Sequence, residues 1–81
     1  MRIRLLLFAL YRDLAGAGEL ELELPAGATA ATLVDAVRRR GGGLGRLPET
    51  PVVAVNQEYA PLETPLREGD EVALLPPVAG G

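Results

Sequence analysis

Residues 19–24 read Glu-Leu-Glu-Leu-Glu-Leu, and this alternation decides the fold class. Successive side chains of a β-strand point to opposite faces, so the glutamates share one face and the leucines share the other. A strand with one apolar face needs a second layer that covers it. The stretch therefore predicts a sheet that is buried on one side and exposed to water on the other.

The residues before this strand predict its partner. From Arg2 to Ala9 the chain begins with arginines that alternate with aliphatic residues, which is again typical of a strand with two different faces. Gly16 and Gly18 then supply turn residues. We expect the two strands to form a hairpin through a longer loop that contains Tyr11 to Ala17.

The residues after the alternating stretch predict one main helix. Pro25 and Gly27 end the strand, and Thr29 is a candidate N-cap because its hydroxyl can accept a hydrogen bond from a free backbone N–H. The apolar residues then recur at the spacing of one helix face, at Ala30, Leu33, Val34 and Val37. The basic block at 38–40 lies where the helix dipole is negative, so helix termination explains it without a binding role.

The rest of the chain predicts further strands and no second domain. Residues 41–45 are expected to be a flexible glycine-rich stretch; they follow a helix, whereas a phosphate-binding loop precedes one. Strands are expected at Val52–Val55, at a short edge strand within Tyr59–Leu66, and at Glu71–Leu75. The order indicates an α+β fold, a mixed four- to five-stranded sheet with one main helix packed on one face. Residues 1–75 would form this domain and residues 76–81 a flexible tail.

The composition excludes most side-chain catalysis. The 81 residues include no cysteine, histidine, serine or lysine. Ser-His and Cys-His nucleophiles, Schiff-base chemistry, disulfides and thiolate metal sites are therefore excluded. We expect no metal site, no permanently bound cofactor and no side-chain nucleophile that belongs to this chain.

The charge balance and hydropathy exclude two classes of partner. The chain has eight arginines and eleven acidic residues, for a net charge of −3, so it is a poor candidate for binding nucleic acid. No apolar run reaches the roughly 18 residues that span a bilayer, and the first ten residues lack the pattern of a signal peptide. The expected compartment is the cytoplasm.

An apolar patch is expected on the outer face of the sheet. Leu6 and Phe8 share the face of the arginines, away from the helix, and Ala73 and Leu75 share one face of the last strand. If the first and last strands are neighbours, these four residues form one patch rimmed by charge, which is typical of partner surfaces. We interpret the patch in this way because the tail leaves beside it. The alternative is a set of scattered apolar residues, which are normal on protein surfaces.

The chain ends in Gly80-Gly81, which has no side chains and can therefore pass through a narrow channel into an active site. A terminal carboxylate is inert at neutral pH, but a mixed anhydride with AMP would make it an acyl electrophile. A sulfur donor could convert that anhydride to a thiocarboxylate, and this route needs no nucleophilic side chain. Taken alone, the same two residues are also compatible with a frayed, tolerated end.

Three segments resemble the MoaD-type sulfur carriers, which are the small subunits of molybdopterin synthase. They are V-A-V-N-Q-E at 53–58, G-D-E-V-A at 69–73 and P-P-V-A-G-G at 76–81. The resemblance covers nearly the whole chain, and the second segment followed by the third is its most specific part. It implies a ubiquitin-like β-grasp fold, which agrees with the order of elements.

The resemblance also implies a reaction and its partners. An E1-like adenylating enzyme would use ATP to adenylate Gly81, and a sulfurtransferase and cysteine desulfurase system would make the thiocarboxylate, so that Gly80 and Gly81 carry the chemistry. The tail would insert into the large subunit, which supplies the catalytic side chains and passes the sulfur to cyclic pyranopterin monophosphate in molybdenum cofactor biosynthesis. Two small subunits would bind a dimer of large subunits. The implied docking residues are Leu6, Phe8, Leu75, Pro76, Pro77, Val78 and Ala79.

Two alternatives remain open from the sequence. A carrier for thiamine synthesis or tRNA thiolation, or a ubiquitin-like modifier, would use the same tail chemistry, although thiamine-pathway carriers usually lack the pair Pro76-Pro77. A β-grasp binding module with an inert tail would depend on the outer patch and not on Gly81.

Overall fold

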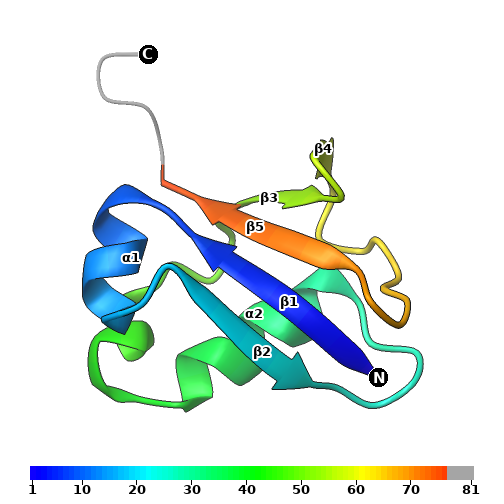
Figure 1. Ribbon diagram of the computed structural model, residues 1–81, viewed down its shortest axis with the longest axis horizontal. Helices are drawn as coiled ribbons and strands as arrows, with labels where there is room; N and C mark the ends of the chain where they lie inside the picture. Colours follow the sequence, from blue (N-terminus) through cyan, green and yellow to red (C-terminus); the bar gives the residue numbers. More distant parts are fainter. Residues whose placement is uncertain (77–81) are drawn as a thin grey trace.

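A mixed five-stranded sheet with one long helix across one face forms the frame of the molecule (Figure 1). The computed structural model describes residues 1–76. The elements in chain order are β1 (Arg2–Leu7), α1 (Ala9–Ala15), β2 (Glu19–Glu23), α2 (Ala30–Arg39), the 3₁₀ helix η1 (Gly42–Arg46), β3 (Val52–Val55), β4 (Glu58–Ala60) and β5 (Glu71–Leu75). The predicted α+β class, with one main helix on one face of the sheet, is confirmed.

The strand order is β2-β1-β5-β3-β4. The first and last strands are parallel neighbours in the middle of the sheet, with Leu5 opposite Val72, and every other pairing is antiparallel. The predicted hairpin of β1 and β2 is confirmed, with Leu5 opposite Leu20. The first and last strands of the described chain therefore lie side by side in the sheet, with their N-terminal ends at one edge and their C-terminal ends at the other.

The helix α2 begins and ends where the sequence predicts. The hydroxyl of Thr29 accepts a hydrogen bond from the backbone N–H of Thr32 at 3.3 Å, and the backbone N–H of Thr29 donates to the Thr32 hydroxyl at 3.1 Å. This reciprocal cap satisfies two backbone donors that have no partner within the helix. Arg39 ends the helix, and its guanidinium lies 3.0 Å from the carboxylate of Asp35.

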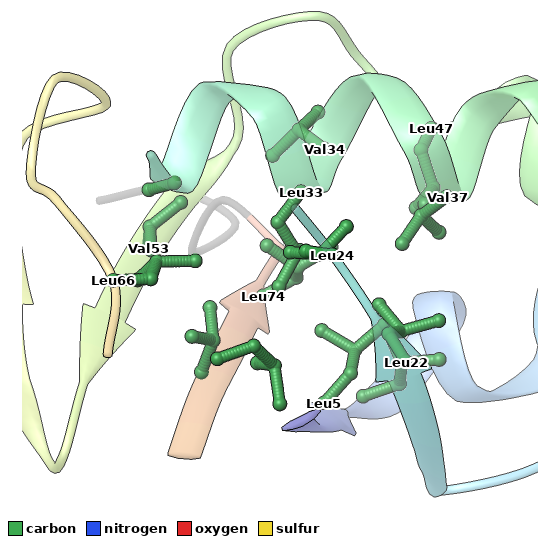
Figure 2. Packing of buried hydrophobic residues seen from close by; sticks show 14 of the residues in the cluster. Leu5, Leu22, Leu24, Leu33, Val34, Val37, Leu47, Val53, Leu66 and Leu74 are labelled. Carbon is green, nitrogen blue, oxygen red and sulfur yellow. The ribbon is translucent and has the colours of Figure 1, made fainter. Parts of the chain in front are cut away.

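The core lies between α2 and the sheet. Leu33 and Val37 project from α2 toward Leu5, Leu22 and Leu74 (Figure 2). All five side chains are buried, so truncating a leucine among them to alanine would cost about 2–5 kcal/mol. Among residues 1–76 no second layer covers the other face of the sheet, as the alternation of residues 19–24 predicts.

The prediction of a loop between the first two strands is wrong, because a short helix occupies most of this segment. The strand β1 ends at Leu7 instead of Ala9, and α1 covers Ala9–Ala15. Ala9 adopts a left-handed backbone (φ 49°), which turns the chain sharply out of the strand. Tyr11 and Leu14, three residues apart, then pack against the core, and this tertiary contact stabilises a helix too short to persist alone.

The prediction that residues 41–45 form a flexible stretch is also wrong. Residues Gly42–Arg46 form η1, and Leu44 is buried in the core. A Cβ atom on Gly43 would lie 2.0 Å from the backbone oxygen of Leu14, so the missing side chain allows η1 to touch the end of α1. The glycine at this position is required by close packing and not by flexibility.

No helix within residues 1–76 is long and apolar enough to cross a membrane.

Candidate functional site

The outer face of the sheet, opposite α2, carries a row of apolar residues that runs across four strands. In the register of the sheet Leu6 lies opposite Ala73, Ala73 opposite Ala54, and Ala54 opposite Tyr59. The two alanines are nearly covered, while the side chain of Tyr59 is 80% exposed. The alanines thus form the floor of this row, and the larger side chains stand at its ends.

A second apolar row lies beside the first, at the end of β5. Leu75 is opposite Val52, which is 47% exposed. Phe8 follows β1 with an extended backbone (φ −124°, ψ 155°), so its side chain continues the outer face and is 45% exposed. We call the two rows together the apolar patch; its members are Leu6, Phe8, Val52, Ala54, Tyr59, Ala73 and Leu75.

Hydrogen bonds at the other end of the β3–β5 pair, where Asn56 follows β3, hold the register of the apolar patch. The side-chain oxygen of Asn56 accepts a hydrogen bond from the backbone N–H of Glu71 at 3.0 Å, and its amide nitrogen donates to the carboxylate of Asp70 at 3.0 Å. Asn56 also donates its own N–H to the Glu71 carbonyl at 2.7 Å. Three hydrogen bonds therefore hold the register that places Val52 beside Leu75.

The other half of the outer face is charged. Arg2 lies 2.9 Å from the carboxylate of Glu21, and Arg4 pairs with Glu71 on β5. Both arginines and Glu21 are well exposed, so these pairs contribute little to stability, about 0.2–1 kcal/mol each. On β1 the boundary between the charged half and the apolar patch lies between Arg4 and Leu6, which are successive residues on the outer face.

The chain leaves the sheet beside the apolar patch. Because β5 is parallel to β1, Leu75 and Phe8 lie at the same end of the two central strands, and Pro76 continues from there (Figure 1). Pro76 is half-buried. The predicted site residues Pro77, Val78, Ala79, Gly80 and Gly81 lie outside the described residues.

The structure brings together most of the docking residues that the sequence predicts, and it adds others. The predicted neighbours Leu6 and Ala73 pair directly, and Leu75 and Phe8 lie beside them, which confirms the expected adjacency of the first and last strands. Ala73 is covered, at 9% exposure, and contributes a floor instead of a contact surface. Sequence reasoning missed Val52, Ala54 and Tyr59. Only the order of the strands shows that these three residues join the patch.

No catalytic constellation is present in residues 1–76. Within this span there is no group of three acidic, histidine or cysteine side chains placed to hold a metal ion, and the buried side chains are apolar apart from the phenol of Tyr11. Burial raises the pKa of the Tyr11 phenol, which packs under the sheet on the side of the core.

The comparison with known families decides the group to which the protein belongs. A model described as the ThiS family matches residues 5–81, which is nearly the whole chain. The chain belongs to the ThiS family.

Relatives of this ThiS-family chain include carriers of molybdopterin synthase. The "Molybdopterin synthase sulfur carrier subunit" of Chlamydomonas reinhardtii is 39% identical over 83 residues, and the match covers 100% of both chains. The resemblance to the MoaD-type sulfur carriers is therefore confirmed.

Solved structures agree with the fold of this ThiS-family chain. A Pyrococcus furiosus protein named as molybdopterin converting factor subunit 1 matches with a TM-score of 0.83 and 32% identity, over 96% of this chain and 99% of that one. The small archaeal modifier protein 1 of H. volcanii matches with a TM-score of 0.75 and 30% identity, over 95% and 98%. A chain in a complex of subunits 1 and 2 of the Helicobacter pylori molybdopterin-converting factor matches with a TM-score of 0.71 and 26% identity, over all of both chains. The fold is the ubiquitin-like β-grasp.

Proposed function

We propose that this chain is the sulfur carrier subunit of a molybdopterin synthase. The carboxylate of Gly81 is adenylated, converted to a thiocarboxylate, and used to donate sulfur to cyclic pyranopterin monophosphate. The observation that carries the proposal is the relative in Chlamydomonas reinhardtii, which is named for this function and matches over its whole length; the family match, from residue 5 to residue 81, includes the two terminal glycines.

The chemistry requires no side chain from this protein. A carboxylate oxygen of Gly81 attacks the α-phosphorus of ATP, an O–P bond forms, and pyrophosphate leaves. A sulfide equivalent then attacks the acyl carbon, a C–S bond forms, and the C–O bond to AMP breaks. ATP is consumed by an E1-like adenylating enzyme, and a sulfurtransferase and cysteine desulfurase system delivers the sulfur. The carrier itself holds no permanent cofactor.

The apolar patch is the surface by which the carrier binds its partner. It lies beside the point at which the chain leaves β5, so a partner that covers Phe8, Leu6 and Leu75 also receives the residues that follow Pro76. The partner is the large subunit, which takes Pro76 to Ala79 into a channel and supplies the catalytic side chains. The Helicobacter pylori complex of subunits 1 and 2 supports a partner of this kind. Two carriers bind a dimer of large subunits, and the assembly acts in the cytoplasm.

A second candidate function uses the same activated end. The likeness to the small archaeal modifier protein 1 of H. volcanii, at 30% identity, favours transfer of the Gly81 acyl group to an amine of another protein. In that case a C–N bond replaces the C–S bond and no sulfur is carried. The two functions share adenylation and differ in the nucleophile that follows it.

Intact mass spectrometry separates these functions. The carrier is incubated with an E1-like adenylating enzyme, ATP and sulfide, and the expected product has one carboxylate oxygen replaced by sulfur. A form that lacks Gly81 is the control and should gain no sulfur. Transfer to the pterin is then followed with a molybdopterin synthase large subunit. A chain that is adenylated but joins only to protein amines would favour the modifier, and a chain with no ATP-dependent change would refute both.

A further inference from the structure

The chain that would carry an activated acyl group has almost no group able to capture it. Amines and thiols are the side chains that most readily attack acyl donors. The sequence has no lysine and no cysteine, and all eight cations are arginine. A guanidinium stays protonated in proteins and is not a nucleophile. No side-chain amine or thiol is therefore available anywhere in the 81 residues.

The α-amino group of Met1 is partly buried and hydrogen-bonded to the neighbouring strand. Its nitrogen donates a hydrogen bond to the carbonyl of Leu24 at 2.6 Å and lies 3.8 Å from the carboxylate of Glu23. The N–H of Leu24 donates in return to the Met1 carbonyl at 2.9 Å, which extends the β1–β2 ladder by one pair. The Met1 side chain is only 10% exposed. To attack a carbonyl carbon the amine must leave Leu24, and the hydrogen bonds that pair Met1 with Leu24 oppose this movement.

The amine also lies far from the exit of the chain. Met1 precedes β1, whereas the chain leaves the sheet after β5, and the two strands are parallel. The amino group and the exit at Pro76 are therefore at opposite ends of the sheet (Figure 1). Attack within one molecule would have to run back along the whole length of the central strands.

The remaining nucleophiles are hydroxyls. They belong to four threonines and to two tyrosines, of which Tyr59 is exposed and Tyr11 is buried. A hydroxyl is a weak acyl acceptor at neutral pH unless a base activates it, and the chain has no histidine to act as that base. Hydroxyl capture is therefore slow compared with attack by a partner's sulfur.

We infer that the folded body of the carrier is inert toward its own activated terminus, because it lacks side-chain amines and thiols and closes the Met1 amine against Leu24. The inference rests on the proposed function. The reaction that is prevented is attack of an amine nitrogen on the Gly81 acyl carbon, in which a C–N bond forms, the C–O bond to AMP breaks, and AMP and a proton leave. The acceptor must then come from a partner. If the chain serves as a modifier, it is attached singly and does not form chains on itself.

A chemical acyl donor tests this without any activating enzyme. The chain is prepared as a Gly81 alkyl thioester and incubated alone at high concentration and at about pH 8, where roughly half of a free α-amino group is unprotonated. Gel electrophoresis and intact mass then count carrier–carrier amides. The unmodified sequence should show hydrolysis and no dimer, and added glycinamide should consume the thioester as a positive control.

Two variants restore an acceptor. An N-terminal Gly-Ser-Gly extension carries the α-amine away from Leu24, and its matched control is the same extension with an acetylated end. Arg40→Lys places an amine at an exposed position after α2 and keeps the charge. We expect the free extension to form dimers at least tenfold faster than the unmodified chain, with Arg40→Lys between them and the acetylated form at the unmodified level.

Two results of the thioester experiment would contradict the inference. Dimers of the unmodified chain at the rate of the extended chain would overturn the inference, and so would an extended chain that consumes glycinamide but never dimerises. Because the thioester is made chemically, neither result depends on adenylation. A failure of the proposed function would appear separately, as the absence of any ATP-dependent change in the reconstituted reaction.

Discussion

Val52 lies directly opposite Leu75 in the antiparallel pair of β3 and β5, one residue before the chain leaves the sheet at Pro76. The residues next to them, Val53 and Leu74, are buried against the core, so Val52 and Leu75 both face away from α2. This pair joins the middle of the chain to its end. A partner that binds Leu75 at the exit of the chain would therefore lie next to Val52 on β3.

Phe8→Asp should weaken binding to a molybdopterin synthase large subunit without unfolding the carrier. Phe8 is the N-cap residue of α1, where aspartate is a favourable capping residue, so the fold is not expected to suffer. In the complex the new carboxylate would be buried without a partner, which costs about 2 kcal/mol or roughly 30-fold in Kd. Titration calorimetry measures the change.

Leu10→Asp is the matched control for that variant. It adds the same charge to the first turn of α1 at a residue that is 59% exposed and outside the apolar patch. We expect its affinity to equal that of the unmodified carrier. Equal loss in both variants would show that charge near α1, and not the apolar patch, governs the association.

Tyr59→Ala tests how far the docking surface extends across the sheet. The side chain is 80% exposed, so its removal should change the free energy of unfolding by less than about 0.5 kcal/mol. If the partner covers the whole apolar patch, affinity should fall about tenfold, which is typical of a contacting tyrosine. Glu58→Ala, on the opposite face of β4, should have no effect. Unchanged affinity for Tyr59→Ala would confine the docking surface to the central strands.

Local periodicity was sufficient to predict β2 and α2. The alternation of residues 19–24 and the stripe after Thr29 each report one buried face, and the observed bounds agree with them. The helix α1 could not be predicted in this way, because it has seven residues and begins with a left-handed turn at Ala9 that no local pattern requires. Its stability comes from contacts with η1 and the core, which are distant in sequence.

The candidate site was predictable only in part, for a related reason. Alternation tells which face a residue occupies, so Leu6 and Leu75 could be assigned to the outer face from the sequence. It does not tell which strands are neighbours. Val52 and Tyr59 join the apolar patch only because the order of strands is β5-β3-β4, and that order depends on pairings between distant segments.

Gly43→Ala should destabilise the fold, whereas Gly45→Ala should not. A Cβ at position 43 would lie 2.0 Å from the backbone oxygen of Leu14, and backbone must move to relieve that contact. The expected cost is about 1–3 kcal/mol. At position 45 the nearest atom is 3.8 Å away, so an alanine there should stay within about 0.5 kcal/mol of the parent. Urea denaturation compares the two. Equal stability would mean that η1 does not pack against α1 in solution.

The last prediction concerns alkaline pH. Burial raises the pKa of the Tyr11 phenol, so the folded state favours the neutral form more than the unfolded state does. The unfolded chain releases this proton first, at about pH 10, and the contribution of Tyr11 to stability is therefore complete below that pH and is lost as pH rises through the higher folded-state pKa.

Tyr11→Phe removes the ionisation. Its free energy of unfolding should fall less steeply above about pH 10 than that of the parent, in denaturation curves measured from neutral to alkaline pH. Parallel curves for the two proteins would show that the phenol of Tyr11 titrates alike in both states and is not buried as the structure places it.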